Sequence, residues 1–286
     1  MNWVIMPYID CWQLTHRAVL DVLDQSIETE ILLIDNGSSG VGRADADTLQ
    51  ALVSRVRVWH HQPPLPALGA TWNMALRYVW EAGGEHALVV NNDVRLHEQL
   101  YAALLRTQQE TGAWFVTACN IAPLEVDPAP ILPWDDAFLS SRGGPDFSCY
   151  LITKECHRWF QFDEGFVPAY HEDNDYHRRL ILAGMGERIF SVPVPYHHIG
   201  SATVNRSETV KAGWGEKFKA SQDYYRQKWG GLPHHETTVV PFDLQLRDGD
   251  LGFADARVLM TGQGKPGNWG FGAKTLFKLP AEDQLG

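Results

Sequence analysis

Three clusters of polar residues directly follow apolar runs in this sequence, and each could support chemistry. The first cluster is Asn91-Asn92-Asp93. Carboxylate and amide oxygens are suitable ligands for Mg²⁺ or Mn²⁺, and a cation held there could in turn hold a diphosphate. Asp93 is the expected ligand. Asp at a strand end is also a common turn or helix-cap residue, so this cluster alone decides nothing.

The second cluster is the acidic run Glu172-Asp173-Asn174-Asp175, which precedes a helical pattern. One of its carboxylates could accept a proton from a bound hydroxyl group, which is the role of a general base. Acidic residues are also favoured in the first turn of a helix by the helix dipole. The residue types therefore leave a catalytic and a purely structural interpretation open.

The third cluster is His197-His198, which follows another apolar run. A neutral imidazole could complete a metal site begun by Asp93, and either histidine could supply it. Other chemistries lack their motifs: there is no G-x-x-x-x-G-K-[ST] loop, no G-x-S-x-G elbow and no G-x-G-x-x-G after the first strand. P-loop nucleotidases, α/β-hydrolases and dinucleotide-binding proteins are therefore disfavoured.

The elements that must position these clusters alternate between strand-like and helical patterns. Short apolar runs predict strands at 3–6, 31–34, 56–59, 87–90, 114–116, 147–153 and 189–192. Helical spacing predicts helices within 14–23, 74–82, 97–110, 173–183 and 216–229. This alternation predicts an α/β fold with an open, twisted, mostly parallel sheet and helices on both faces. Ligands bind such sheets beyond the carboxyl ends of the strands, where Pro7, Tyr8, Asp35 and Asn36 also fall.

Composition limits the classes of protein. The 286 residues are 44% hydrophobic, enough for a large core, and 24 basic against 35 acidic residues give a net charge of −11. A general nucleic-acid-binding face is disfavoured, and residues such as Arg178 and Arg179 are expected to be ordinary surface charges. No apolar stretch suits a transmembrane helix, and the N-terminus lacks secretory features. Four scattered cysteines without C-x-x-C spacing predict free thiols and a cytoplasmic location.

The chain is expected to contain one main domain and an extension. Residues 1–232 form the predicted main domain. The proline-rich stretch 121–144 reads as a loop that could line a site. The Gly-rich extension 233–286 could wrap the domain, mediate homo-oligomerisation or be partly mobile, and the sequence does not choose among these.

Taken in order, these motifs resemble the family-two glycosyltransferases with the GT-A fold, a Rossmann-like sheet. The resemblance covers most of residues 1–232 and rests on seven ordered motifs. It implies a nucleotide-sugar-binding half at about 1–120 and an acceptor half at about 121–232. They are Val4-Ile5-Met6-Pro7-Tyr8, Ile31-Leu32-Leu33-Ile34-Asp35-Asn36-Gly37-Ser38, Gly69-Ala70-Thr71-Trp72-Asn73, Val89-Val90-Asn91-Asn92-Asp93-Val94, Phe162-Asp163-Glu164, Glu172-Asp173-Asn174-Asp175 with Arg179-Leu180, and His197-His198-Ile199-Gly200-Ser201. Seven motifs in order are far more specific than any one of them.

The resemblance implies an inverting transfer of a sugar from a nucleotide-diphosphate sugar to an acceptor hydroxyl, assisted by Mn²⁺ or Mg²⁺. It implies that Asp173 is the general base. The other implied roles are nucleotide-sugar binding by Pro7, Tyr8, Asp35, Asn36, Gly69, Asn73 and Asn92, metal binding by Asp93 and His197, and acceptor binding by Glu172 and Trp134. Asn91 stands where many members have Asp, which would weaken metal binding. Asn36 stands where many have a second Asp, which leaves the donor nucleotide open.

Other functions stay open at this point. One is a related nucleotidyl- or phospho-sugar transferase. A second is a non-catalytic carbohydrate- or partner-binding protein, in which exposed Trp134, Trp214, Trp229 and Trp269 would stack on sugars. A third is a phage-type glycosyltransferase acting on a modified nucleobase, suggested by Tyr224-Tyr225 and Lys228-Trp229-Gly230-Gly231. The acceptor itself could be a glycan, a protein, a small molecule or a modified nucleobase.

Overall fold

The computed structural model describes residues 1–38, 40–120, 146–239 and 241–243, and these residues divide into two compact units. Of the described residues, unit 1 contains those within 1–65, 71–157 and 187–214, and unit 2 contains those within 66–70, 158–186 and 215–243. Segments of the two units therefore alternate along the chain. The domain boundary expected at 232 stays a prediction, because most of the extension lies outside the described residues.

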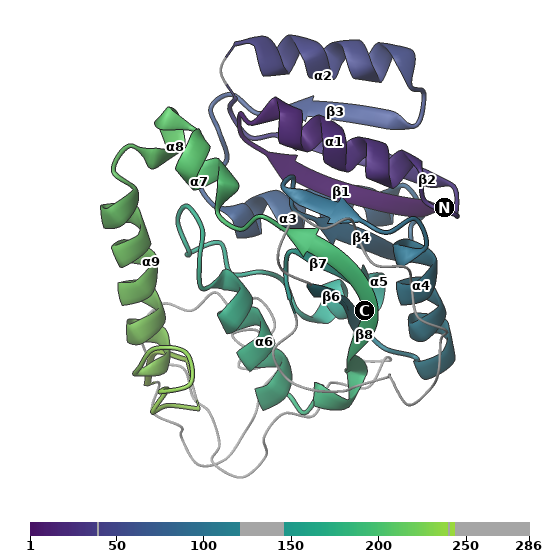
Figure 1. The fold of residues 1–286 in the computed structure, drawn as a ribbon. Helices are drawn as coiled ribbons and strands as arrows, with labels where there is room; N and C mark the ends of the chain where they lie inside the picture. Colours follow the sequence, from purple (N-terminus) through teal and green to yellow (C-terminus); the bar gives the residue numbers. More distant parts are fainter. Residues whose placement is uncertain (39, 121–145, 240, 244–286) are drawn as a thin grey trace. The chain divides into compact units, whose positions relative to one another are not determined.

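Unit 1 contains an eight-stranded sheet with the order β3-β2-β1-β4-β7-β6-β8-β5 (Figure 1). The strands are β1 (Asn2–Tyr8), β2 (Thr29–Asp35), β3 (Val56–His60), β4 (His86–Val90), β5 (Val94–Leu96), β6 (Phe115–Asn120), β7 (Cys149–Thr153) and β8 (Ile189–His198). β1 to β4 run parallel to one another, and β6 pairs in parallel with β8. β7 and β5 run antiparallel to their neighbours. The predicted mostly parallel α/β sheet is confirmed.

Helices cover both faces of this sheet, as the sequence predicts. They are α1 (Trp12–Leu23), α2 (Val41–Leu52), α3 (Leu68–Glu81), α4 (Leu100–Thr111) and α5 (Lys154–Trp159). Successive residues of a strand point to opposite faces. Val4 and Met6 of β1 therefore share a core with buried residues of α1, α2 and α4. Trp3 points to the other face, where its ring lies 5.7 Å from that of Tyr78 in α3.

Several elements differ from the sequence predictions. α2 was not predicted, because its sequence VGRADADTLQAL has few large apolar residues. β5 has only three residues, too short for a periodic signal. The remaining short elements are η2 (Gly186–Arg188), α7 (Ala202–Arg206), α8 (Glu208–Lys211) and η3 (Pro241–Asp243). Within the described residues, no helix has the length and apolar character needed to cross a membrane.

Unit 2 is built around α6 (Glu172–Leu182) and the part of α9 (Trp214–Trp229) that starts at residue 215. Phe166, Tyr225 and Trp229 form its small apolar cluster. Trp229 is fully buried, so the expectation that it is exposed for sugar stacking is wrong. Trp134 and Trp269 lie outside the described residues.

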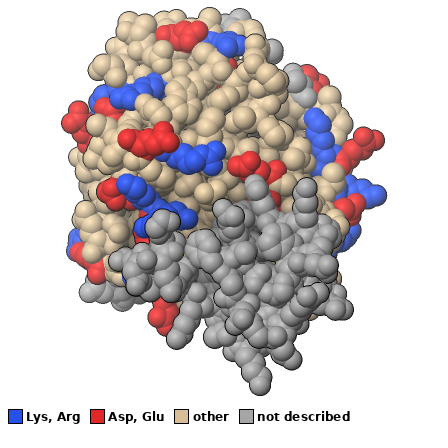
Figure 2. Space-filling view, turned by 180° about the vertical axis from the view of Figure 1, so that it is seen from behind, with Lys and Arg blue, Asp and Glu red and all other residues tan. Residues whose placement is uncertain are grey.

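The visible surface of the described residues carries mixed charge. In the view of Figure 2, acidic and basic side chains lie next to one another over the part of the surface that is not grey. This is the pattern of an ordinary solvated surface rather than of a basic stripe that follows a phosphate backbone.

All four cysteines are free, with Cys149 and Cys156 buried.

Candidate active site

The carboxyl ends of β1 and β2 bring Tyr8 and Asp35 side by side, because these two residues are register partners. Asp35 is only 1% exposed. Its Oδ1 accepts a hydrogen bond from the Ser38 N–H at 2.7 Å, and its Oδ2 lies 2.7 Å from Nδ1 of His60. Nε2 of His60 lies 2.8 Å from Oδ1 of Asp47. Asp35 therefore ties the loop after β2 to the end of β3.

Tyr8 and Asn36 have different surroundings at this edge. The Tyr8 hydroxyl is buried and has no hydrogen-bond partner among the described residues. Burial, together with the nearby charge of Asp35, raises its pKa, so the phenol stays neutral. The Asn36 amide is engaged with Leu65, accepting from its N–H at 2.7 Å and donating to its carbonyl at 3.2 Å. Tyr8 thus offers an unused polar atom to a ligand, whereas Asn36 holds a loop.

Asp93 follows the end of β4 and lies beside His198 at the end of β8. Its Oδ1 is 3.1 Å from Nε2 of His198, and its Oδ2 accepts from the Ala202 N–H at 3.3 Å. The carboxylate of Asp93 raises the pKa of His198, although burial acts in the opposite direction. Nδ1 of His198 lies 2.9 Å from Oγ of Ser148, and Nδ2 of Asn91 lies 3.4 Å from Nε2.

The resemblance implies metal binding by His197, but His198 is the residue whose ring lies beside Asp93, so a metal role for His197 stays a prediction. Neighbouring residues of a strand point in opposite directions, so only one of the two rings can face Asp93. His197 is 2% exposed, and its ring nitrogens have no hydrogen-bond partner among the described residues. The choice could not be made from sequence, because the side that each residue faces depends on strand register.

The Asp93 and His198 donors fit a divalent cation of the Mn²⁺ type. Two adjacent ligands of an octahedral ion at about 2.1 Å lie about 3.0 Å apart, close to the observed O···N separation of 3.1 Å. A carboxylate oxygen with an imidazole nitrogen is a suitable donor set. In the described part of the chain, no group of three or more His, Cys, Asp or Glu side chains could hold a metal. The pair would therefore be a partial site. Ser148, which sequence reasoning missed, would orient the imidazole from behind.

Three other predicted nucleotide-sugar residues are packed into the scaffold. Asn92 donates to Oγ1 of Thr15 at 3.0 Å, and Oδ1 of Asn73 lies 3.2 Å from Nε2 of His157. Gly69 belongs to unit 2, where an added Cβ would lie 3.0 Å from the carbonyl oxygen of Asp163. Pro7 is an internal residue of β1. Nucleotide binding by these residues stays a prediction, and Trp134 lies outside the described residues.

In unit 2, the acidic run forms the start of α6, and its three carboxylates have different environments. Glu172 is 5% exposed, its Oε2 has no hydrogen-bond partner among the described residues, and burial and the Asp173 charge raise its pKa well above the usual value. Asp175 is fully buried. Asp173 is half-buried, and its Oδ1 accepts from the Asn174 N–H at 2.7 Å. Asp173 is therefore the most accessible of the three.

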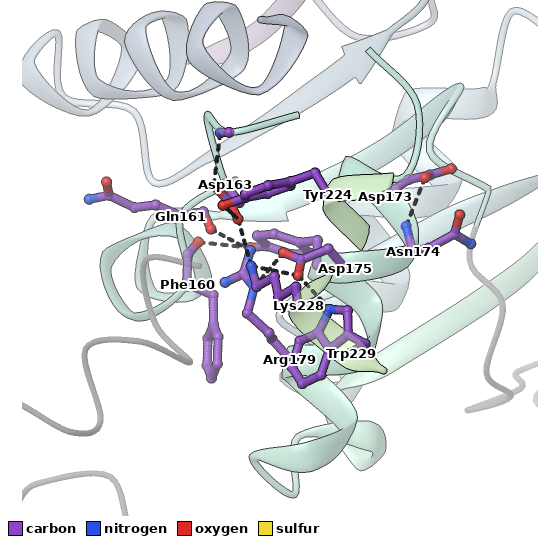
Figure 3. A network of polar contacts seen from close by, with 12 residues as sticks. Phe160, Gln161, Asp163, Asp173, Asn174, Asp175, Arg179, Tyr224, Lys228 and Trp229 are labelled. Carbon is purple, nitrogen blue, oxygen red and sulfur yellow. Dashed lines mark hydrogen bonds and ion pairs between the residues drawn. The ribbon is translucent and has the colours of Figure 1, made fainter. Parts of the chain in front are cut away.

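Asp175 belongs to a buried ionic network (Figure 3). Nζ of Lys228 lies 2.6 Å from Oδ2 of Asp163 and 2.7 Å from Oδ1 of Asp175. Nε of Arg179 lies 2.8 Å from Oδ2 of Asp175. These four side chains are 0% exposed, and their two positive and two negative charges balance. The expectation that Arg179 is a surface charge is therefore wrong.

The same network shifts its carboxylates in opposite directions. Burial raises the pKa of Asp163, with the Lys228 ammonium acting against it. For Asp175, burial is outweighed by Lys228 and Arg179, and the pKa is lowered. Tyr224 donates to Oδ2 of Asp163 at 3.1 Å, and the Trp229 indole donates to Oδ1 of Asp175 at 2.9 Å. Asp175 is thus a structural anion at neutral pH.

The fold is similar to those of solved glycosyltransferases. TarS 1-349 from S. aureus aligns over 77% of this chain and 70% of its own, with 13% identity and a TM-score of 0.51. TarS 1-349 in complex with UDP-GlcNAc aligns over 79% and 71%, with 13% identity and a TM-score of 0.52. Mannosyltransferase PcManGT from Pyrobaculum calidifontis, in complex with GDP-Man and Mn²⁺, aligns over 69% and 56%, with 14% identity and a TM-score of 0.54.

The sequence gives a family match as well. Residues 3–128 match the family described as glycosyl transferase family 2. No curated protein matches the sequence significantly. The fold is GT-A, and the chain is a glycosyltransferase. The matched family is the one that the ordered motifs of the sequence resemble.

Proposed function

We propose that this glycosyltransferase moves a sugar from a nucleoside-diphosphate sugar to an acceptor hydroxyl with inversion at the anomeric carbon. In this proposal Asp173 is the general base. The observation that carries it is the different burial of the carboxylates in the first turn of α6: Glu172 and Asp175 are buried, while Asp173 is half-buried. A base must reach the hydroxyl from which it takes a proton, and Asp173 is the accessible carboxylate of this turn.

The donor side of the proposal rests on unit 1. β1, β2 and β4 are parallel, so Tyr8, Asp35 and Asp93 lie at one edge of the sheet, where ligands bind in folds of this type. Asp93 and His198 would hold Mn²⁺ or Mg²⁺, and the bound ion would neutralise charge on the departing diphosphate. Among the structural neighbours, TarS is known with UDP-GlcNAc and PcManGT with GDP-Man and Mn²⁺, which supports a donor of this class.

The proposed reaction is a single displacement. The acceptor oxygen forms a bond to the anomeric carbon while the bond from that carbon to the diphosphate oxygen breaks. The hydroxyl proton passes to the Asp173 carboxylate, and the nucleoside diphosphate leaves with the bonding electron pair. Attack from the side opposite the leaving group inverts the configuration at the anomeric carbon.

The test does not require knowledge of the acceptor, because water can replace it in slow donor hydrolysis. Thermal unfolding with UDP-GlcNAc or GDP-Man, each with Mn²⁺ or with EDTA, measures donor binding, since a ligand of the folded state raises the apparent unfolding temperature. We expect a shift that requires the metal ion. Asp93→Ala should lose the metal-dependent part of this shift.

Asp173→Asn tests the base separately. It should keep donor binding while donor hydrolysis falls by about 100- to 10,000-fold. Asp223→Asn is the matched control, because Asp223 lies on α9 with its side chain 54% exposed. Undiminished hydrolysis by Asp173→Asn would exclude Asp173 as the base. Equal donor binding with Mn²⁺ and with EDTA would exclude the metal role of Asp93.

A further inference from the structure

The turn that carries Asp173 begins from an unusual backbone conformation. Tyr170 and His171, which immediately precede α6, have φ values of 76° and 71°. Positive φ is disfavoured for residues other than glycine, and two in succession persist only where the surroundings hold them. The His171 ring lies 5.7 Å from the Phe218 ring and 5.4 Å from the Tyr225 ring. Both aromatic residues belong to α9, so α9 contacts the residue directly before this turn.

α9 also contacts the other end of the same turn. Lys228 and Trp229, in its last turn, place an ammonium nitrogen at 2.7 Å and an indole nitrogen at 2.9 Å from Oδ1 of Asp175. Asp175 lies two residues after Asp173 in α6. The residue before the catalytic turn and the residue at its end are therefore both held by α9, as Figure 3 shows for the Asp175 side.

Lys228 joins this turn to a second segment of unit 2. Its ammonium lies 2.6 Å from Oδ2 of Asp163, whose Oδ1 accepts from the Gly165 N–H at 2.8 Å. Without Lys228, two fully buried carboxylates would share the single positive charge of Arg179. An uncompensated buried charge is strongly unfavourable. Either the segments that carry Asp163 and Asp175 would move apart, or one of these two carboxylates would take up a proton.

We propose that Lys228 is a positioning residue for transfer. Its ammonium holds the first turn of α6 against α9 and against the segment that carries Asp163. It thereby fixes the orientation of the Asp173 carboxylate. The catalytic part of this inference rests on the proposed function of Asp173.

Hydrogen exchange tests the mechanical part without any substrate. Lys228→Met and Lys228→Arg are compared with Lys219→Met, a control on an exposed position of the same helix. We expect faster amide exchange over residues 172–178 in Lys228→Met, a smaller effect in Lys228→Arg, and no change in Lys219→Met. Exchange in the β1 to β4 strands of unit 1 should be unchanged in all three variants.

Donor hydrolysis tests the catalytic part. A misplacement of a catalytic group by about 1 Å can cost about 100-fold in rate. We therefore expect kcat of Lys228→Met to fall by about 10- to 100-fold, with the donor KM within about twofold of wild type. Lys228→Arg should recover part of kcat. A lysine that contributed only to stability would leave kcat unchanged for the folded protein.

Trp229→Phe decides the question if Lys228→Met does not fold, because it removes the indole donor to Asp175, keeps Lys228 and retains an aromatic ring at this position. Its kcat should then fall by about threefold, with a smaller rise in exchange over the same residues. Unchanged exchange in every folded variant would overturn the proposal, as would faster exchange with an unchanged kcat. Failure of the proposed function is recognised separately, since Asp173→Asn would then hydrolyse donor normally.

Discussion

His157 should make the stability of this protein fall in mild acid. The ring is 2% exposed, Nδ1 accepts from the Trp80 indole at 3.0 Å, and Nε2 lies 3.2 Å from Oδ1 of Asn73. These contacts suit the neutral ring with its proton on Nε2. Burial, with a further contribution from the charge of Arg77, lowers the pKa of His157 to about 3. An unfolded histidine has a pKa of about 6.5.

The sign and size of the effect follow from these two values. Below pH 6.5 the unfolded chain binds a proton at His157, whereas the folded chain keeps the ring neutral, so the free energy of unfolding decreases as the pH falls. Linkage between about 6.5 and about 3 gives a loss of about 2 kcal/mol from pH 7 to pH 5. Each further pH unit down to about pH 3 costs about 1.4 kcal/mol.

The measurement is urea unfolding of wild type and His157→Gln at pH 7, 6 and 5. Glutamine retains a hydrogen-bonding amide and does not titrate, and the other titratable groups are common to both proteins. Wild type should therefore lose about 2 kcal/mol relative to His157→Gln between pH 7 and pH 5. If the difference in unfolding free energy between the two proteins changes by less than about 0.5 kcal/mol from pH 7 to pH 5, the argument is refuted. A change of that size does not exceed the fitting error of the extrapolation.

Three further changes give distinct outcomes. Because the pKa of Glu172 is raised in the folded state, wild type loses stability as the pH rises above about 4.3, the pKa of an unfolded glutamate. Glu172→Gln does not titrate, so it should gain stability relative to wild type over this range. Parallel pH profiles of the two proteins in urea would contradict this. Gly69→Ala should lose about 1 kcal/mol, since its Cβ would crowd a main-chain oxygen at 3.0 Å, whereas Gly215→Ala, with nothing within 4 Å, should be neutral or stabilising. Ser148→Ala removes the partner of Nδ1 of His198 and should weaken Mn²⁺ binding about tenfold in a calorimetric titration with donor nucleotide present; unchanged affinity would show that the hydroxyl does not orient this ring.

The strands of the sheet could be predicted because their sequences have a clear physical signature. β2 is buried over most of its length, and a strand covered on both faces reads as a continuous apolar run. The polar residues at the strand ends could be predicted for the same reason, since each follows such a run. Asp35 and Asp93 were found in this way.

The partners of those residues could not be predicted. Lys228 and Asp163 are 65 residues apart, and no local pattern relates them. Charged residues are also rarely buried, so Arg179 and Lys228 read as surface groups until their counterions are placed. The choice between His197 and His198 depends on which face of β8 each one occupies. Ser148 carries no signal of its own, because serine is common in loops and its role comes only from the imidazole beside it.

The buried network of unit 2 has a consequence for the synthesis of the chain. Asp163 leaves the ribosome 65 residues before Lys228, which corresponds to roughly 3 to 13 seconds of translation. During that interval the acidic side chains of the network lack the ammonium that neutralises them in the folded state, and they must remain hydrated. Unit 2 is therefore expected to stay open on the nascent chain. Emergence of the last turn of α9 is the event that allows it to close.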